Sequence, residues 1–305
     1  WLAGIVGAGD GGGPGGFGGG DTLNGSNTGG GGAGMGGAVF NLFGTVTILN
    51  STLSQNVASG GSGGGSADSP SSKNGQSGSG FGGGVFNLNG VVNVVNSTLA
   101  GNGVGYALGA GAPGQMSGAA VYCIAMGLTP EGGQAAATVN LGNSILTSSN
   151  PAVPAVASFP AYGPTTINAI GPNLLSNVPV EVRDAAVNDD QAATYAVRSY
   201  RASGAADLLA TSSAPRSYTG VRFLVADPRL GALGTNGGQA STRALLPRSP
   251  AIGRGSNRLA AAYGLETDAR GPGFQRRVGR SVDLGAFEFH PGAGPRFARR
   301  PGALR

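Results

Sequence analysis

The chain has few of the side chains that carry most enzyme chemistry. Its 305 residues include one cysteine, Cys123, and one histidine, His290, and 11% of them are charged. A single cysteine excludes an intrachain disulfide, and a Ser–His–Asp triad would depend on His290 alone. No apolar run approaches the ~20 residues of a membrane-spanning helix. We therefore expect no catalytic residue, cofactor, metal site or transmembrane segment.

Positively charged residues are scarce in the first part of the chain. Residues 1–180 contain one lysine and four acids, a net charge of −3, whereas residues 181–305 contain eighteen arginines and ten acids, a net charge of +8. A basic half suits polyanions such as acidic polysaccharide, anionic lipid or nucleic acid. Scattered arginines are also ordinary on a solvated surface. We favour that second interpretation and expect no nucleic-acid partner.

What the chain does contain is glycine, at 61 positions, and an internal repeat. Residues 36–56 match residues 82–102 at thirteen of twenty-one positions, and a looser third copy starts at Gly118 and resumes at Ala137. Self-similarity of this kind is typical of a solenoid, in which each unit buries its apolar face against its neighbours.

Alternation of apolar and polar residues places strands within the repeat. The pattern predicts strands at Ala38–Leu42 and Thr45–Leu49, then a third strand further along, and the Asn89–Gly90 pair predicts a turn with a positive φ. Inward-facing apolar residues recur at equivalent places in the three copies. We expect them to form a stacked core of Val46, Ile48, Leu53, Val92, Val94, Leu99, Val139 and Leu141.

Asparagine recurs where two strands of the repeat meet. Asn50, Asn96 and Asn143 are each followed by serine, and asparagine tolerates the left-handed backbone that a sharp corner requires. Stacked side-chain amides can hydrogen-bond along such a column, so we expect a structural asparagine ladder here. Asn56 and Asn102 would close a second row. Three short strands per turn predict an all-β, right-handed, single-stranded parallel β-helix of the pectate-lyase-like type.

The composition changes along the chain and suggests five segments. Glycine-rich stretches at 57–81 and 103–117 are expected to be solvated loops inserted into the coil. The expected segments are a glycine-rich N-terminal part of an incomplete rung (1–35), rungs with glycine-rich loops (36–150), an irregular continuation of the solenoid (151–225), a less regular C-terminal cap (226–289) and a basic tail (290–305).

Two parts of the chain resemble bacterial surface proteins. The repeats resemble the GGAxxN…NSTxxxN units of polymorphic-outer-membrane-protein-like β-helices. Residues 226–250 (ADPRLGALGTNGGQASTRALLPRSP) and 267–289 (TDARGPGFQRRVGRSVDLGAFEF) resemble the choice-of-anchor Q domain, and GPNLLS at 171–176 matches a shorter stretch of that family. The sequence departs from the family pattern at Arg243, Gly253-Arg254 and Ala269. The resemblance implies a secreted or surface-attached protein.

Four charged residues in this C-terminal region form a candidate constellation: Asp268, Arg270, Asp283 and Glu288. Paired carboxylates can perform acid–base catalysis or bind calcium. Arginine–carboxylate pairs and turn caps can instead close the exposed end of a solenoid. We favour the structural interpretation, because these acids lie beside glycine and proline turns.

The repeats carry no Asp, Glu, Lys, Arg or His within their predicted strands, which favours a scaffold over an enzyme. We expect an exported, non-enzymatic adhesin, stalk or matrix component that contacts cell-surface glycans or matrix through its loops. A polysaccharide lyase or hydrolase is the alternative, with a catalytic face built from residues 181–190 and the C-terminal region. A third hypothesis is a filament formed by head-to-tail self-association, in which residues 1–6 supply an exchanged strand.

Overall fold

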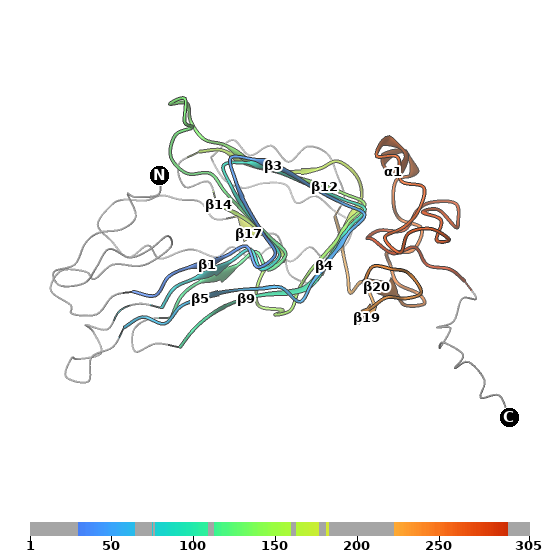
Figure 1. Cartoon of the computed structure of the whole chain (residues 1–305), viewed down its shortest axis with the longest axis horizontal. Coiled ribbons are helices and arrows are strands. Elements are labelled where there is room, and N and C mark those ends of the chain that lie inside the picture. Colours follow the sequence, from blue (N-terminus) through green and yellow to red (C-terminus); the bar gives the residue numbers. More distant parts are fainter. Residues whose placement is uncertain are drawn as a thin grey trace.

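Figure 1 shows the computed structural model of the chain, which describes residues 30–64, 75, 77–108, 113–159, 163–176, 181–182 and 223–291. Within these ranges strands dominate, and the one α-helix is α1 (Asn257–Ala262). The expectation of an all-β chain with parallel sheets is confirmed. The proposed exchanged strand at 1–6, most of the irregular stretch before residue 223 and the basic tail beyond residue 291 lie outside the described residues.

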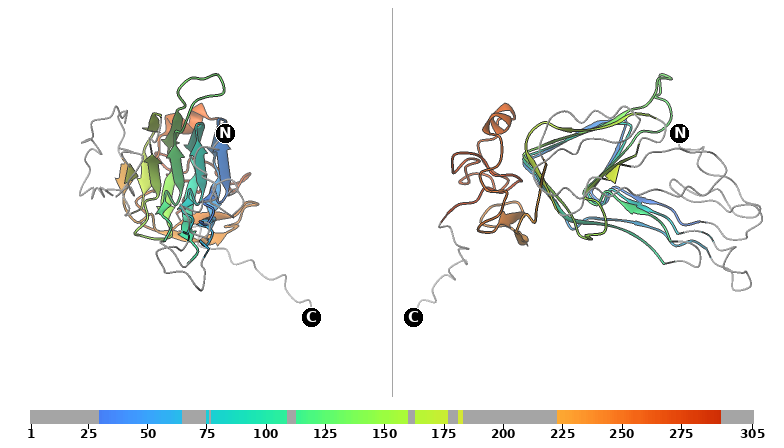
Figure 2. Two further views of the ribbon diagram at one scale, coloured as in Figure 1. Left: turned by 90° about the vertical axis from the view of Figure 1, so that its left-hand side faces the viewer. Right: turned by 180° about the vertical axis from the view of Figure 1, so that it is seen from behind.

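Three parallel sheets surround the core, and the chain passes through them in the same order again and again (Figures 1 and 2). We call the three sheets together the coil, and one passage of the chain through all three a turn. Sheet 1 contains β2 (Val39–Leu42), β7 (Val85–Leu88), β11 (Val121–Ile124), β14 (Val156–Phe159) and β17 (Glu181–Val182). Sheet 2 contains β3 (Thr45–Leu49), β8 (Val91–Val95), β12 (Ala137–Gly142) and β15 (Thr165–Ala169). Sheet 3 contains β4 (Thr52–Ser54), β9 (Thr98–Tyr106), β13 (Ile145–Ser148), β16 (Asn173–Leu175) and β18 (Phe223–Val225).

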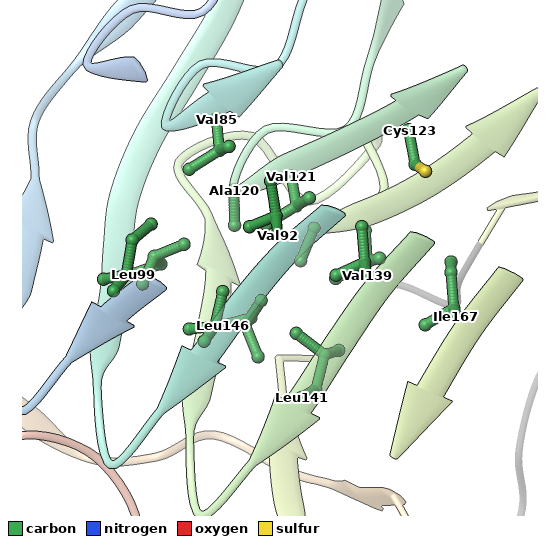
Figure 3. Close-up of a cluster of buried hydrophobic side chains, with 14 of the residues drawn as sticks. Val85, Val92, Leu99, Ala120, Val121, Cys123, Val139, Leu141, Leu146 and Ile167 are labelled. Atoms are coloured by element: carbon green, nitrogen blue, oxygen red, sulfur yellow. The ribbon is translucent and has the colours of Figure 1, made fainter. Parts of the chain in front are cut away.

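Equivalent residues of successive turns pair in register, so like side chains stack on one another. Val46 lies opposite Val92, which lies opposite Val139. All eight residues of the predicted core stack belong to one hydrophobic cluster, with Val46 and Leu53 at its partly exposed edge (Figure 3). Parallel pairing therefore turns a sequence repeat into continuous rows of buried valine, isoleucine and leucine.

A fourth turn follows the three that the repeat predicts. It consists of β14, β15 and β16, and Ile167 continues the row that contains Val139. The matching signal in the sequence is weak, because this turn keeps the inward apolar positions but not the GGAVFN or NST words. The fold therefore requires the alternation of apolar and polar residues in each turn, but it does not require the GGAVFN and NST sequence motifs.

In the described parts of the glycine-rich stretches, residues 57–60, 80–81, 103–106 and 116–117 lie in paired strands, which corrects the prediction of solvated loops at these residues. Two layers project from the coil: β1 (Gly34–Met35), β6 (Gly80–Phe81) and β10 (Met116–Ser117) form one, and β5 (Val57–Gly60) pairs with β9 to form the other. We call these layers the glycine arm. They touch backbone to backbone, and Gly61 N donates to Gly32 O while Gly78 N donates to Gly61 O, both at 2.8 Å. A Cβ at Gly34, Gly60 or Gly80 would overlap backbone atoms of the opposite layer, so these positions require glycine for space.

The C-terminal region, residues 226–291, lies against one flank of the coil and does not close its end, which corrects the predicted position of the cap (Figures 1 and 2). It contains the antiparallel pair β19 (Leu230–Gly234) and β20 (Thr242–Leu245) and the helix α1. Ile145 and Leu174 point outward from sheet 3 and pack with Leu284 and Phe287 of the cap. Packing of the cap against these two outward-facing residues removes their apolar surface from water, which stabilises the cap at this flank of the coil.

Two adjacent glycines test the glycine arm. A Cβ at Gly60 would overlap the carbonyl oxygen of Gly78, whereas a Cβ at Gly61 would lie 3.5 Å from the nearest atom, Gly32 N. We expect Gly60→Ala to destabilise the arm by about 2 kcal/mol, the usual scale of overpacking, and Gly61→Ala to have a much smaller effect. Hydrogen exchange of the β5 and β6 amides measures both. Equal protection in the two variants would contradict backbone-to-backbone packing.

Candidate functional site

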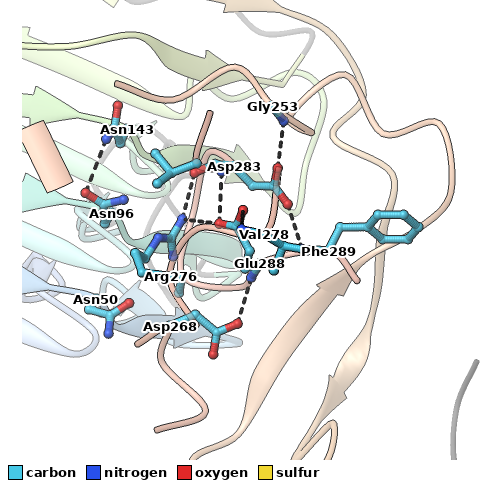
Figure 4. A network of polar contacts seen from close by, with 12 residues as sticks. Asn50, Asn96, Asn143, Gly253, Asp268, Arg276, Val278, Asp283, Glu288 and Phe289 are labelled. Carbon is cyan, nitrogen blue, oxygen red and sulfur yellow. Dashed lines mark hydrogen bonds and ion pairs between the residues drawn. The ribbon is translucent and has the colours of Figure 1, made fainter. Parts of the chain in front are cut away.

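The four charged residues predicted from the sequence do converge, in the interior of the cap. Figure 4 shows three of them, Asp268, Asp283 and Glu288. Asp268, Arg270, Asp283 and Glu288 are all buried, and no more than 5% of any of them is exposed. They come from two turn-rich segments on either side of residues 271–282. Burial of so many ionisable groups is costly unless each one is paired and hydrogen-bonded, so the contacts of each group decide its role.

Asp268 and Arg270 form the closest ion pair, with 2.6 Å between Oδ2 and Nη2. The guanidinium also donates to the carbonyl of Glu288 at 2.7 Å, and its carbon lies 4.0 Å and 3.8 Å from the ring centres of Phe274 and Phe287. Asp268 in turn accepts the backbone N–H of Glu288 at 2.8 Å. The pair thus fastens the chain near residue 268 to the chain near residue 288.

Asp283 and Glu288 hold further turns through backbone N–H groups. Asp283 accepts from Gly253 and Phe289, both at 2.6 Å. Glu288 accepts from Asp283 N at 3.0 Å and from Val278 N at 3.3 Å. Every carboxylate of the network therefore acts as an acceptor for loop backbone, which is the arrangement of a structural cap.

Arg276 is the member that the sequence did not reveal. It is 1% exposed, donates to the carbonyl of Asp283 at 2.7 Å and lies 3.4 Å from Glu288 Oε2. Its Nε and Nη1 have no hydrogen-bond partner among the described residues. Arg277, its neighbour, is exposed, and nothing in the QRRVGR segment distinguishes the two.

Burial dominates the electrostatics of this network. It raises the pKa of Glu288 from 4.5 to about 7, with the charge of Asp283 acting in the same direction and Arg276 against it. Burial likewise raises the pKa of Asp283 and lowers the pKa of Arg276. The Arg276–Glu288 attraction does not fully offset the loss of hydration, as is common for buried ion pairs.

The corner asparagines connect the coil to the cap. Asn50, Asn96 and Asn143 have φ values of 48°, 48° and 50°. Asn143 Nδ2 donates to Asn96 Oδ1 at 3.3 Å, while Asn50 Nδ2 donates to the Thr267 carbonyl at 3.1 Å. The side-chain nitrogen of Asn96 and the side-chain oxygen of Asn50 are buried without a hydrogen-bond partner among the described residues. The predicted ladder therefore has one bond between Asn143 and Asn96, and the first turn is bonded to the cap instead.

Cap residues also bind the corner directly. Ser256 N donates to Asn143 Oδ1 at 2.7 Å and Gly285 N donates to the Asn143 carbonyl at 2.7 Å. Ala286 N donates to Thr98 Oγ1 at 2.9 Å. Together with the bond from Asn50, these contacts join the cap to three consecutive turns of the coil.

Two further asparagine rows are present, and the sequence analysis predicts one of them. Asn56 donates to Asn102 at 3.0 Å, as predicted for the second row. On the outer face of sheet 2, Asn168 donates to Asn140, Asn140 to Asn93 and Asn93 to Thr47, at 2.9, 2.7 and 3.2 Å. The alternation that predicts the inner rows implies this outer row as well, because its members share one register.

Cys123 occupies a packed position in the core. Burial raises the pKa of its thiol to about 12, and Asn87 donates to its sulfur at 3.6 Å. A thiol that stays protonated is a poor nucleophile and metal ligand. Within the described part of the chain, no three acidic, cysteine or histidine side chains are arranged to bind a metal ion.

No helix in the described ranges is long and apolar enough to cross a membrane. Comparison of the chain with known protein families, with curated proteins and with solved structures finds no match. The contacts of the described residues therefore carry the functional argument.

The raised pKa of Glu288 predicts a pH dependence of stability. The folded state holds this proton more tightly than the unfolded state does, so the free energy of unfolding should fall as pH rises from about 4.5 to about 7, by roughly 2 kcal/mol. Asp283, whose pKa is also raised by burial, adds to the same trend. Urea unfolding at several pH values measures the slope. Glu288→Gln should flatten it, and Asp227→Asn, at an exposed acid, should not; an unchanged slope in Glu288→Gln would contradict the assignment.

Asn143 offers a second test, because it supports both the corner and the cap. Asn143→Ala removes the side-chain hydrogen bonds to Asn96 and Ser256 and leaves a strained φ, so we expect the free energy of unfolding to fall by about 3 kcal/mol. Asn143→Gly removes the same bonds but tolerates the φ, and its loss should be smaller by up to ~1 kcal/mol. Asn168→Ala, at the partly exposed end of the outer row, is the control. Thermal unfolding gives all three values.

Proposed function

We propose that the chain is a non-enzymatic scaffold of the bacterial surface or extracellular matrix, built as a right-handed parallel β-helix with a choice-of-anchor-Q-like flanking cap. The in-register parallel turns support the β-helix class, and the sequence motifs support the family. Export and surface placement follow from that resemblance. A rigid coil of this kind would hold its projecting arm and its cap at fixed positions.

One observation carries the scaffold proposal: ionisable side chains are nearly absent from the coil. Among the described residues between 30 and 176, Glu131 is the one charged residue. Polysaccharide hydrolysis needs a pair of carboxylic groups that flank the scissile bond, and acid–base catalysis needs groups in reach of the substrate. The described faces of the coil offer neither.

The alternative, a polysaccharide lyase or hydrolase, would need the acids of the cap or those of residues 181–190. Asp268, Asp283 and Glu288 are buried and accept backbone N–H groups, so a polymer cannot reach their oxygens without unfolding the cap. The side chains of residues 181–190 lie outside the described residues.

Head-to-tail self-association is supported by a separate observation. On the first turn, Leu42 and Phe43 are 47% and 41% exposed, and β2, β3 and β4 are the terminal strands of their sheets. An open sheet edge with apolar side chains is suited to pairing with another strand. We therefore keep a filament subunit as the second candidate.

The scaffold proposal is tested in the organism that makes the protein and with the purified chain. We expect the natural gene product in the cell-surface or extracellular fraction, accessible to external protease. We also expect no increase in reducing ends or unsaturated uronates when the purified chain is incubated with a panel of acidic glycans. A cytoplasmic location would contradict the surface role, and released products would favour the enzyme. Electron microscopy of the purified chain distinguishes single coils from filaments.

A further inference from the structure

The surface of the cap is strongly basic, although its interior is balanced. Residues 223–291 contain nine arginines and five acids. Two of the arginines and three of the acids form the buried network, so the cap surface has seven arginines against two acids, Asp227 and Glu266. Since the described part of the coil adds only two acids, Glu131 and Glu181, the cap surface keeps a clear excess of positive charge.

Four of these arginines lie on two segments that run side by side. Residues 253–258 are bound to residues 277–283 through Gly253 N to Asp283 Oδ1 at 2.6 Å, Gly255 N to the Val282 carbonyl at 2.7 Å and a reciprocal pair made by Asn257. Asn257 donates to the carbonyl of Arg280 at 2.9 Å and accepts from Val282 N at 2.8 Å. The exposed arginines on these segments are Arg254, Arg258, Arg277 and Arg280.

The buried network fixes this surface in place. Asp283, which binds Gly253, is itself held by Glu288, and Glu288 also binds Val278 between Arg277 and Arg280. None of the four arginines has an ion-pair partner among the described residues. Uncompensated charge of one sign opposes folding through self-repulsion. A surface that is rigid, basic and unpaired is therefore suited to an anionic partner.

The geometry points to a binding surface for an anionic polysaccharide, formed by Arg254, Arg258, Arg277 and Arg280. Guanidinium groups bind carboxylate and sulfate groups through paired N–H donors. A polymer with such a group on each sugar would meet several of the arginines at once, and multivalent contact raises the overall affinity. The choice of an extracellular polymer as the partner rests on the proposed function at the cell surface. The arginine cluster itself is observed in the structure and does not depend on that proposal.

Nucleic acid and membrane fit this surface less well. Single-stranded nucleic acid binds by stacking its bases on aromatic rings, but no aromatic side chain of the described cap is exposed, and Phe274 is covered by Arg270. Insertion into a membrane interface needs an apolar face. Val278 is the one large exposed apolar side chain on the two segments.

Binding to polygalacturonate, dextran sulfate and neutral dextran tests the inference on the full chain. We expect micromolar-range affinity for at least one of the two anionic polymers at low salt, none for neutral dextran and at least a tenfold loss on raising the salt severalfold. The two anionic probes separate carboxylate from sulfate preference.

Two double variants separate a site from net charge. Arg254→Gln with Arg280→Gln should weaken binding at least fivefold. Arg229→Gln with Arg248→Gln removes the same charge from two exposed arginines outside the two segments and should change binding less than twofold. Equal losses would overturn the site. Arg254→Lys with Arg280→Lys keeps the charge and should retain part of the affinity, and unchanged thermal unfolding shows that each variant is folded.

Other outcomes are equally decisive. Tighter binding of the chain to single-stranded DNA, or to vesicles of anionic lipid, than to both anionic polysaccharides would overturn the inference in favour of that partner. Absence of binding to all of them would show an ordinary solvated surface. These binding measurements use purified protein, so polysaccharide binding can be absent even if the protein is found at the cell surface. Conversely, finding the protein in the cytoplasm would not change the measured binding.

Discussion

The structure depends on the hydrogen bonds that join each turn of the chain to the next in parallel register. A single turn has three short strands and one apolar face, and it cannot bury that face by itself. Pairing in register places Val46, Val92 and Val139 in one row, so the apolar rows and the asparagine rows arise from the same backbone contact. The lack of charged residues at the described inward positions is part of this constraint, since a charged side chain repeated at an inward position would be buried in every turn.

The glycine arm and the cap satisfy backbone groups in two different ways. In the arm, backbone meets backbone, and glycine removes the side chains that would separate the layers. In the cap, regular structure is limited to β19, β20 and α1. Buried carboxylates accept N–H groups from its turns at Gly253, Val278 and Phe289, as neighbouring strands do in the coil. Both solutions follow from the need to pair buried polar backbone.

The sequence was most informative where a residue does the same task in every turn. The apolar stack and the positive φ of the corner asparagines could be predicted because repetition separates a structural requirement from chance. The fourth turn was obscured, since it keeps only the alternation. The glycine arm is not predictable from composition, which cannot distinguish glycine that makes a segment flexible from glycine that leaves space for a neighbouring backbone. The position of the cap depends on Ile145 and Leu174 facing outward, and the burial of Arg276 beside the exposed Arg277 depends on tertiary contacts that no local pattern records.

The attachment of the cap to the flank changes how the coil can come apart. In a linear array each unit contacts only its neighbours, so the terminal units open independently and at low free energy. Here the cap is bonded to Asn50 in the first turn, Thr98 in the second and Asn143 in the third. Opening the first turn must also break contacts with a body held by the second and third turns. The cap thereby links the first three turns and makes unfolding of the coil more cooperative. A mechanical force applied to the first turn is distributed over several turns.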